Sequence, residues 1–171
     1  MIQYLKKDDF MNKKKVIYPG TFDPITYGHL DIIKRCFNVY DEVIVAIADN
    51  EGKGPLLTLE ERIDLVKKSV INIKNVSVES FSGLLMDYAF KKGIKSVIRG
   101  LRAISDFEYE FQMALTNRKL CPEIETIFMM PSEEYSYISS RSIKEICALG
   151  GDVLKFVPKH VEAKLREKLT C

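Results

Sequence analysis

The sequence predicts one α/β domain, with an open parallel sheet covered by helices on both faces and two further helices at the C-terminal end. Short apolar segments alternate along the chain with amphipathic helical segments, which is typical of βαβ units. Several of the apolar segments are continuous, such as Val16-Ile17-Tyr18, as expected for strands that are buried on both faces. With 171 residues, 46% of them hydrophobic, the chain is long enough for a proper core.

The expected elements follow one another regularly. The predicted strands are Lys15–Tyr18, Glu42–Ala48, Asn75–Glu79, Ser96–Arg99 and Glu125–Met129. The predicted helices are His29–Phe37, Leu59–Val70, Leu84–Lys92, Asp106–Lys119, Ser140–Leu149 and Pro158–Leu169. Thr58 and Glu61 have the spacing of a capping box, which supports a helix start there. Residues 1–13 are rich in Lys and Asp, so we expect an N-terminal extension without fixed structure, with Met11 as an alternative start.

Bulk properties exclude several classes of protein. A net charge of +2 argues against a dedicated nucleic-acid binder, and no apolar run is long enough to span a bilayer. The start of the chain does not have the pattern of a signal peptide. The four cysteines show no CxxC spacing, and there are only two histidines, so we expect no metal site built from the chain's own residues. These features predict a cytoplasmic protein that binds neither nucleic acid nor membrane.

Residues 18–29 carry the strongest local signal. They join an apolar strand to a helix through a segment rich in Gly and Pro, a geometry in which α/β proteins bind phosphates. Gly20 and Gly28 are expected to let the backbone approach a ligand or adopt a positive φ. A lone histidine at a helix start is usually structural. Because Thr21 and His29 flank one loop, however, we expect them to bind charge that develops on a phosphate.

More cationic residues follow other strands, where ligands of open α/β sheets bind. Arg99 and Arg102 flank Gly100 and are expected to bind phosphate oxygens bidentately. The alternative is that both arginines are solvated and pair with an acidic residue of the next helix, namely Asp106, Glu108 or Glu110. Lys53 lies between two glycines and could close over an anion, although such a lysine is most often simply exposed.

A segment rich in hydroxyl groups, residues 135–142, precedes the fifth predicted helix. One of its serines is expected to cap that helix, and Ser142 with Glu145 has the spacing of a capping box. The remaining hydroxyls, together with Arg141 and Lys144, suit a polyphosphate at a helix N-terminus. The chain has no GxxxxGK[ST], GxGxxG or GxSxG string, which argues against P-loop, dinucleotide-binding and serine-hydrolase chemistry.

Several of these segments resemble a known family. Thr26-Tyr27-Gly28-His29 resembles the T/HxGH signature of the nucleotidylyltransferase superfamily, and Ile138-Ser139-Ser140 resembles its ISS-type motif. Longer strings are similar to those of bacterial phosphopantetheine adenylyltransferases: Tyr-Pro-Gly-Thr-Phe-Asp-Pro-Ile-Thr-Tyr-Gly-His, Thr-Leu-Glu-Glu-Arg, Ile-Arg-Gly-Leu-Arg-Ala and Asp-Phe-Glu-Tyr-Glu. The similarity runs from about Lys15 to the C-terminus with matching order and spacing.

The resemblance implies a Rossmann-like nucleotidylyltransferase domain over residues 14–171 and a homohexamer. It also implies that ATP, bound with Mg²⁺, and 4′-phosphopantetheine give dephospho-coenzyme A and pyrophosphate, a step of coenzyme A synthesis. The acceptor phosphate is already anionic, so in-line attack needs neither a general base nor a covalent intermediate. The alternatives are a nucleotidylyltransferase with a different acceptor and a non-catalytic nucleotide sensor.

The resemblance also implies roles for particular residues. The implied catalytic residues are His29, Thr21, Lys53 and Arg99. The residues implied for phosphopantetheine are Thr21, Lys53, Leu85 and Arg99. The residues implied for ATP are Thr21, Phe22, His29, Gly100, Leu101, Arg102, Glu110, Tyr135, Ser136, Tyr137, Ile138, Ser139, Ser140 and Arg141. Many members carry a small hydroxyl residue in place of Arg141, so this arginine either adds a phosphate contact or points to solvent.

Overall fold

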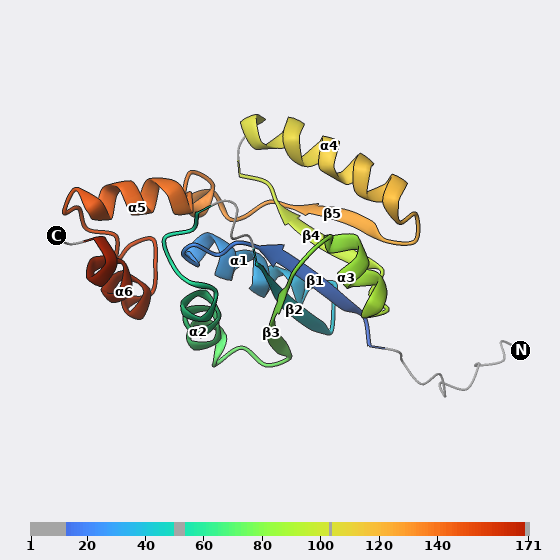
Figure 1. The fold of residues 1–171 in the computed structure, drawn as a ribbon, viewed down its shortest axis with the longest axis horizontal. Coiled ribbons are helices and arrows are strands. Elements are labelled where there is room, and N and C mark those ends of the chain that lie inside the picture. Colours follow the sequence, from blue (N-terminus) through green and yellow to red (C-terminus); the bar gives the residue numbers. More distant parts are fainter. Residues whose placement is uncertain (1–12, 50–53, 103, 170–171) are drawn as a thin grey trace, which may run out of the picture.

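A five-stranded parallel sheet forms the centre of the molecule, in a computed structural model that describes residues 13–49, 54–102 and 104–169 (Figure 1). The strands are β1 (Lys15–Gly20), β2 (Glu42–Ala48), β3 (Val76–Phe81), β4 (Ser96–Gly100) and β5 (Glu125–Met129). Their order in the sheet is β3-β2-β1-β4-β5, and every neighbouring pair is parallel. The predicted Rossmann-like class is therefore confirmed.

Helices connect the strands and cover both faces of the sheet. They are α1 (Tyr27–Cys36), α2 (Leu59–Val70), α3 (Leu85–Lys91), α4 (Ile104–Leu120), the 3₁₀ turn η2 (Glu133–Tyr135), α5 (Ser140–Ala148) and α6 (Lys159–Leu169). Figure 1 shows α5 and α6 together at the end of the molecule toward which the strands point. The pocket described below lies at this carboxyl end, as expected for an open α/β sheet.

Strand β1 shows how the core forms on both faces of the sheet. Val16 and Tyr18 pack in one hydrophobic cluster with α1, α2, α5 and α6. Ile17, which points to the opposite face, packs in a second cluster with α3. All three side chains are buried, which explains why this strand is continuously apolar in the sequence.

The start of α1 differs from the sequence-based expectation. The helix begins at Tyr27 rather than at His29, because Thr26 serves as its N-cap. Neither Gly20 nor Gly28 takes a positive φ, which was one of the two possibilities expected for them; in this loop that conformation occurs at Phe22, with φ of 50°. Gly20 is required for another reason, since a Cβ there would lie 2.9 Å from the Phe22 ring.

Two further capping expectations had different outcomes. The Thr58–Glu61 box at the start of α2 is confirmed. The Thr58 backbone N–H donates to the Glu61 carboxylate at 3.0 Å, and the Glu61 backbone N–H donates to the Thr58 hydroxyl at 3.3 Å. The box expected between Ser142 and Glu145 is wrong. Ser139 caps α5 instead and accepts the Ser142 N–H at 2.9 Å, because the helix begins two residues before Ser142.

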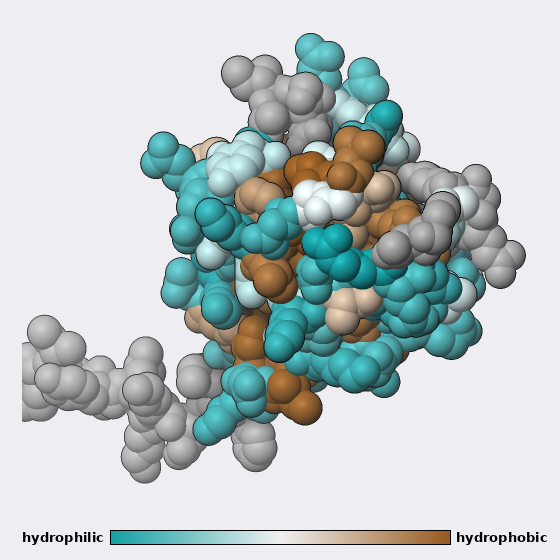
Figure 2. All heavy atoms as spheres, turned by 90° about the vertical axis from the view of Figure 1, so that its left-hand side faces the viewer, coloured by the Kyte–Doolittle hydropathy of each residue, from teal (hydrophilic) through white to brown (hydrophobic). Residues whose placement is uncertain are grey.

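The surface is mixed in character. Seen from the end formed by α5 and α6, hydrophilic residues dominate, with hydrophobic areas among them (Figure 2). Within residues 13–49, 54–102 and 104–169, no helix combines the length and the apolar character needed to cross a membrane.

Candidate active site

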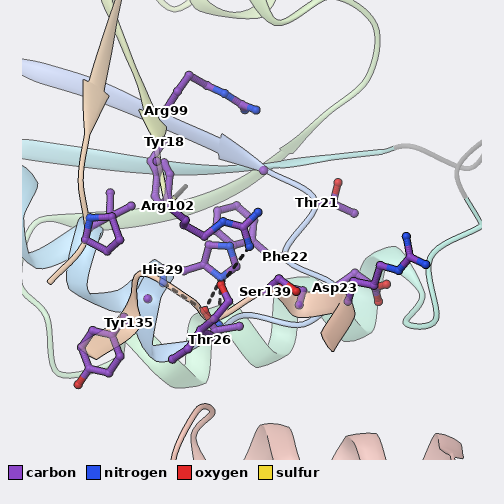
Figure 3. Close-up of a pocket in the computed structure, with 18 of the residues that line it drawn as sticks. Tyr18, Thr21, Phe22, Asp23, Thr26, His29, Arg99, Arg102, Tyr135 and Ser139 are labelled. Carbon is purple, nitrogen blue, oxygen red and sulfur yellow. Dashed lines mark hydrogen bonds between the residues drawn. The ribbon is translucent and has the colours of Figure 1, made fainter. Parts of the chain in front are cut away.

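A pocket of about 390 Å³ opens where β1 and β4 lie side by side at the carboxyl end of the sheet. The connections from β1 and β4 lead to opposite sides here, which makes this point the topological switch of the sheet. The loop from β1 to α1, the end of β4, the residues near η2 and the start of α5 all line it. Figure 3 shows His29 near the middle of these side chains, next to Phe22 and Arg102.

The pocket brings together most of the residues that the family resemblance implied for ATP. Those that line it are Thr21, Phe22, His29, Gly100, Arg102, Glu110, Tyr135, Ile138, Ser139, Ser140 and Arg141. Leu101, Ser136 and Tyr137 do not: the Leu101 N–H binds Met129, Ser136 binds Glu133, and Tyr137 is largely exposed. Lys53 lies outside the described residues.

His29 is held by the capping box of α1. Its ring Nδ1 accepts a hydrogen bond from the Thr26 backbone N–H at 3.0 Å, and the backbone N–H of His29 donates to the Thr26 hydroxyl at 3.3 Å. A backbone N–H can only donate, so Nδ1 is an acceptor and the proton of the neutral ring sits on Nε2. The helix start therefore fixes both the ring orientation and the tautomer of His29.

The environment of His29 keeps the ring uncharged. Burial lowers its pKa to about 4, and the nearby positive charge of Arg102 acts in the same direction. The neutral form is thus dominant near pH 7, and its Nε2–H is a fixed hydrogen-bond donor for the pocket. Such a donor can bind a phosphate oxygen without transferring a proton.

Phe22 supports this imidazole. Its ring is buried and lies 5.1 Å from the centroid of His29 and 5.5 Å from that of Tyr18, in edge-to-face arrangements. A positive φ is rare for a bulky residue, and Phe22 has a φ of 50° at this point of the pocket lining. The structure thus packs Phe22 against His29.

Arg99 forms a bidentate ion pair with Glu110 of α4. The two N–H···O distances are 2.7 and 2.5 Å, and the Glu110 side chain is only 13% exposed. This pairing was the alternative considered from the sequence for these arginines, but the pair lines the pocket instead of the outer surface. Arg102 differs, since it donates to the Ile138 carbonyl at 3.0 Å and thereby joins β4 to the segment before α5.

A second pocket, also about 390 Å³, adjoins the first. It shares Thr21, Arg99 and Glu110 with the first pocket and continues between α3 and α4 over a mainly apolar lining. Leu85, which the family resemblance implied for the pantetheine arm, lines this second pocket. The two pockets therefore meet at one wall that carries a hydroxyl and an ion pair.

Arg62 of α2 is a structural residue of the site that sequence reasoning did not single out. Its guanidinium is almost fully buried and donates to the backbone carbonyls of Thr21, Ala48 and Leu57 at 3.0, 2.8 and 3.3 Å. The available signal was its position, because Arg62 shares the buried helix face with Leu65 and Val66. A charged residue on that face indicates a buried polar partner.

We expect Arg62→Met to lower the free energy of unfolding by about 2–4 kcal/mol, because three carbonyls would lose their charged donor in the interior. Denaturant unfolding measures this. Arg118→Met is the matched control, since the ion pair of Arg118 with Glu125 is largely exposed and should contribute less than about 1 kcal/mol. Equal losses in the two variants would contradict the role given to Arg62.

The pocket carboxylates are occupied by cations of the chain itself. Glu110 binds Arg99, and Asp23 binds Lys144. In the part of the chain that the structure describes, no group of three or more Asp, Glu, His or Cys side chains is arranged to hold a metal ion. These side chains do not offer a metal ion a ligand set of their own.

Comparisons with known proteins agree with this geometry. The family model described as cytidylyltransferase-like matches residues 17–146. A Vibrio parahaemolyticus structure assigned as a nicotinate-nucleotide adenylyltransferase superposes with a TM-score of 0.66 at 19% identity, covering 90% of this chain and 98% of that one. At this identity the superposition supports the fold alone. Fold and family model define the class: the protein is a nucleotidyltransferase.

Curated relatives narrow the class further. The chain is 55% identical to the phosphopantetheine adenylyltransferase of Alkaliphilus metalliredigens, over 89% of this chain and 97% of the relative. It is 54% identical to that of Dictyoglomus turgidum, over 90% and 96% of the two chains. The chain belongs to the phosphopantetheine adenylyltransferase family, as its motifs predicted.

Proposed function

We propose that this protein transfers the adenylyl group of ATP to 4′-phosphopantetheine, giving dephospho-coenzyme A and pyrophosphate. The observation that carries the proposal is the pair of adjoining pockets that share Thr21, Arg99 and Glu110, the first rich in charged and hydroxyl side chains and the second mainly apolar. The first pocket suits a nucleoside triphosphate, and the apolar one suits a long acceptor arm. Their common wall is where an acceptor phosphate would meet the α-phosphate.

The reaction in this arrangement is a single in-line displacement. An oxygen of the acceptor phosphate forms a bond to the α-phosphorus, while the bond from that phosphorus to the oxygen bridging to the β-phosphorus breaks and pyrophosphate leaves. The acceptor is an anion before it binds, so positioning and charge stabilisation are the tasks that remain. The Nε2–H of His29 and the hydroxyl of Thr21 would bind the non-bridging oxygens of the α-phosphate.

Cations and helix ends would hold the two polyanions together. Arg99 would bind the acceptor phosphate, and Arg102 with the N-terminus of α5 would bind the triphosphate. Lys53 stays a predicted contact of the acceptor phosphate. Because the pocket carboxylates are already paired, Mg²⁺ would enter as part of the substrate MgATP. Free thiols at Cys36, Cys121 and Cys147 suit the reducing cytoplasm that we propose as its location.

The acceptor is tested by pyrophosphate release from ATP with a panel of acceptors. We expect release with 4′-phosphopantetheine and none with pantetheine, which lacks the phosphate, or with nicotinate mononucleotide. Release with nicotinate mononucleotide instead would favour a sibling transferase. No release with any acceptor, together with measurable ATP binding, would favour a nucleotide sensor.

We further propose a homohexamer, with α4 in contact with other copies. Figure 1 shows α4 at the β5 edge of the molecule, apart from the other helices. Large apolar side chains are exposed along it: Phe107, Tyr109, Phe111, Met113, Leu115 and Leu120. A helix that is apolar on several sides is normally buried by neighbours.

We expect Leu115→Glu to shift the protein to smaller species in light scattering, because it places a charge on this exposed apolar helix. Leu149→Glu is the matched control, since Leu149 is also an exposed leucine but lies at the end of α5. An unchanged mass for the Leu115 variant would exclude this side of α4 from the contact.

A further inference from the structure

Asp23 lies at a junction between three segments of the active site. It follows Thr21 and Phe22 in the loop from β1 to α1, and its side chain is only 7% exposed. Its two carboxylate oxygens accept the backbone N–H groups of Leu56 and Leu57 at 3.1 and 2.9 Å. The third donor is the ammonium of Lys144, from α5.

Lys144 has two conceivable uses in this pocket, which it also lines. A lysine that lines the pocket together with Ser139 and Ser140 could bind a triphosphate as a point charge. The structure instead directs its ammonium to Asp23, and the two charges neutralise each other. A carboxylate as buried as that of Asp23 needs such a partner, because an unpaired charge in the interior is strongly unfavourable.

We propose that Lys144 is a positioning residue that acts through Asp23 to hold the β1–α1 loop in its catalytic geometry. This inference rests on the proposed adenylyl transfer. A second contact supports it, since the Ser140 hydroxyl donates to the Pro24 carbonyl at 2.8 Å and also ties α5 to this loop. The loop carries Thr21 and supports His29 through Phe22, so a shift of the loop would misplace the groups that meet the α-phosphate.

The proposal makes a specific kinetic prediction. Lys144→Met should lower kcat by about 10- to 100-fold, the scale of a misplacement of about 1 Å, with the KM for ATP changed less than about threefold. Lys144→Arg, which keeps the charge, should retain most of the turnover. A lysine that binds the triphosphate directly would instead raise the KM for ATP in Lys144→Met.

A double-mutant cycle separates the two uses of Lys144. If Lys144 acts through Asp23, the variant with both Lys144→Met and Asp23→Asn should be no slower than the slower single variant. Fold losses that multiply in the double variant would overturn the proposal. If Lys144→Met does not fold, the cycle is run with Lys144→Gln and the same criteria apply.

Two controls make the outcome specific. Lys164→Met removes a lysine of similar exposure, 24% against 27% for Lys144, whose partners Glu61 and Glu167 do not line the pocket, and it should leave kcat unchanged. The wild-type protein is assayed first with ATP and 4′-phosphopantetheine. An inactive wild type would count against the proposed function, whereas an active wild type with an equally active Lys144→Met variant would count against this inference alone.

Discussion

Replacing His29 by alanine is expected to lower kcat on the order of 10²–10³-fold, with little change in the KM for ATP. The expectation follows from the neutral, oriented ring, whose Nε2–H would bind the α-phosphate more strongly as charge develops on its oxygens. An interaction made mainly in the transition state affects turnover rather than ground-state binding. Steady-state kinetics with ATP and 4′-phosphopantetheine measures both quantities.

The control for His29→Ala is Thr58→Ala. Both substitutions remove one half of a capping box at a helix start, so both should lower stability, with the loss of the Thr58 N-cap costing about 0.5–2 kcal/mol. Thr58 does not line either of the two adjoining pockets, and its variant should keep normal turnover. If both variants lost turnover equally, capping of the helices, and not the imidazole, would explain the effect.

The low pKa of His29 also predicts how stability depends on pH. The folded pKa of about 4 lies below the ordinary 6.5, so the folded protein disfavours the charged ring. The stabilising contribution of the neutral His29 ring to the free energy of unfolding is complete above pH 6.5 and declines as the pH falls toward 4. As the pH falls from 7.5 to 4.5, the wild type should therefore lose free energy of unfolding relative to His29→Ala. A difference between the two that stays constant with pH in chemical denaturation would contradict this.

Arg99→Met is expected to lower kcat/KM for 4′-phosphopantetheine by about 10²–10³-fold, which is within the range of about 2–5 kcal/mol typical of a broken buried charge pair. Two effects add. The acceptor phosphate would lose a cation, and the Glu110 carboxylate, now unpaired, would repel it. Kinetics at saturating ATP with varied acceptor measures the change.

The repulsion can be isolated with a second substitution. Glu110→Gln in the Arg99→Met background removes the unpaired carboxylate, so the double variant should recover part of the lost kcat/KM. Glu110→Gln alone keeps the guanidinium and should have the smallest effect of the three. A double variant slower than Arg99→Met would show that Glu110 has a role beyond holding Arg99.

The sequence was most informative where structure depends on local patterns. Short apolar segments located the strands, and the capping-box spacing of Thr58 and Glu61 located the start of α2, whose N-cap is Thr58. The contacts that organise the pocket were not visible in this way. The partners Lys144 and Asp23 are 121 residues apart, and Arg62 is 41 residues from Thr21. Only folding brings such pairs together. With 26 cationic and 24 acidic residues in the chain, the sequence alone does not show which of them pair.

Several predicted site residues line the pocket, but the sequence did not specify their contacts there. Arg99 pairs with Glu110, which was the alternative considered from the sequence, and Phe22 packs edge-to-face against His29. A strand–loop–helix motif determines which residues reach the ligand side. It does not determine rotamers, which depend on neighbours from other elements, such as α4 for Arg99.

The wall shared by the two pockets has a consequence for the end of the catalytic cycle. Under the proposed reaction, the new bond joins a nucleotide in one pocket to an arm in the other, across Thr21 and Arg99. The product is then a bisubstrate ligand, which blocks both incoming molecules at once and gains from the contacts of each. Its departure would have to empty both compartments, whereas pyrophosphate leaves from one.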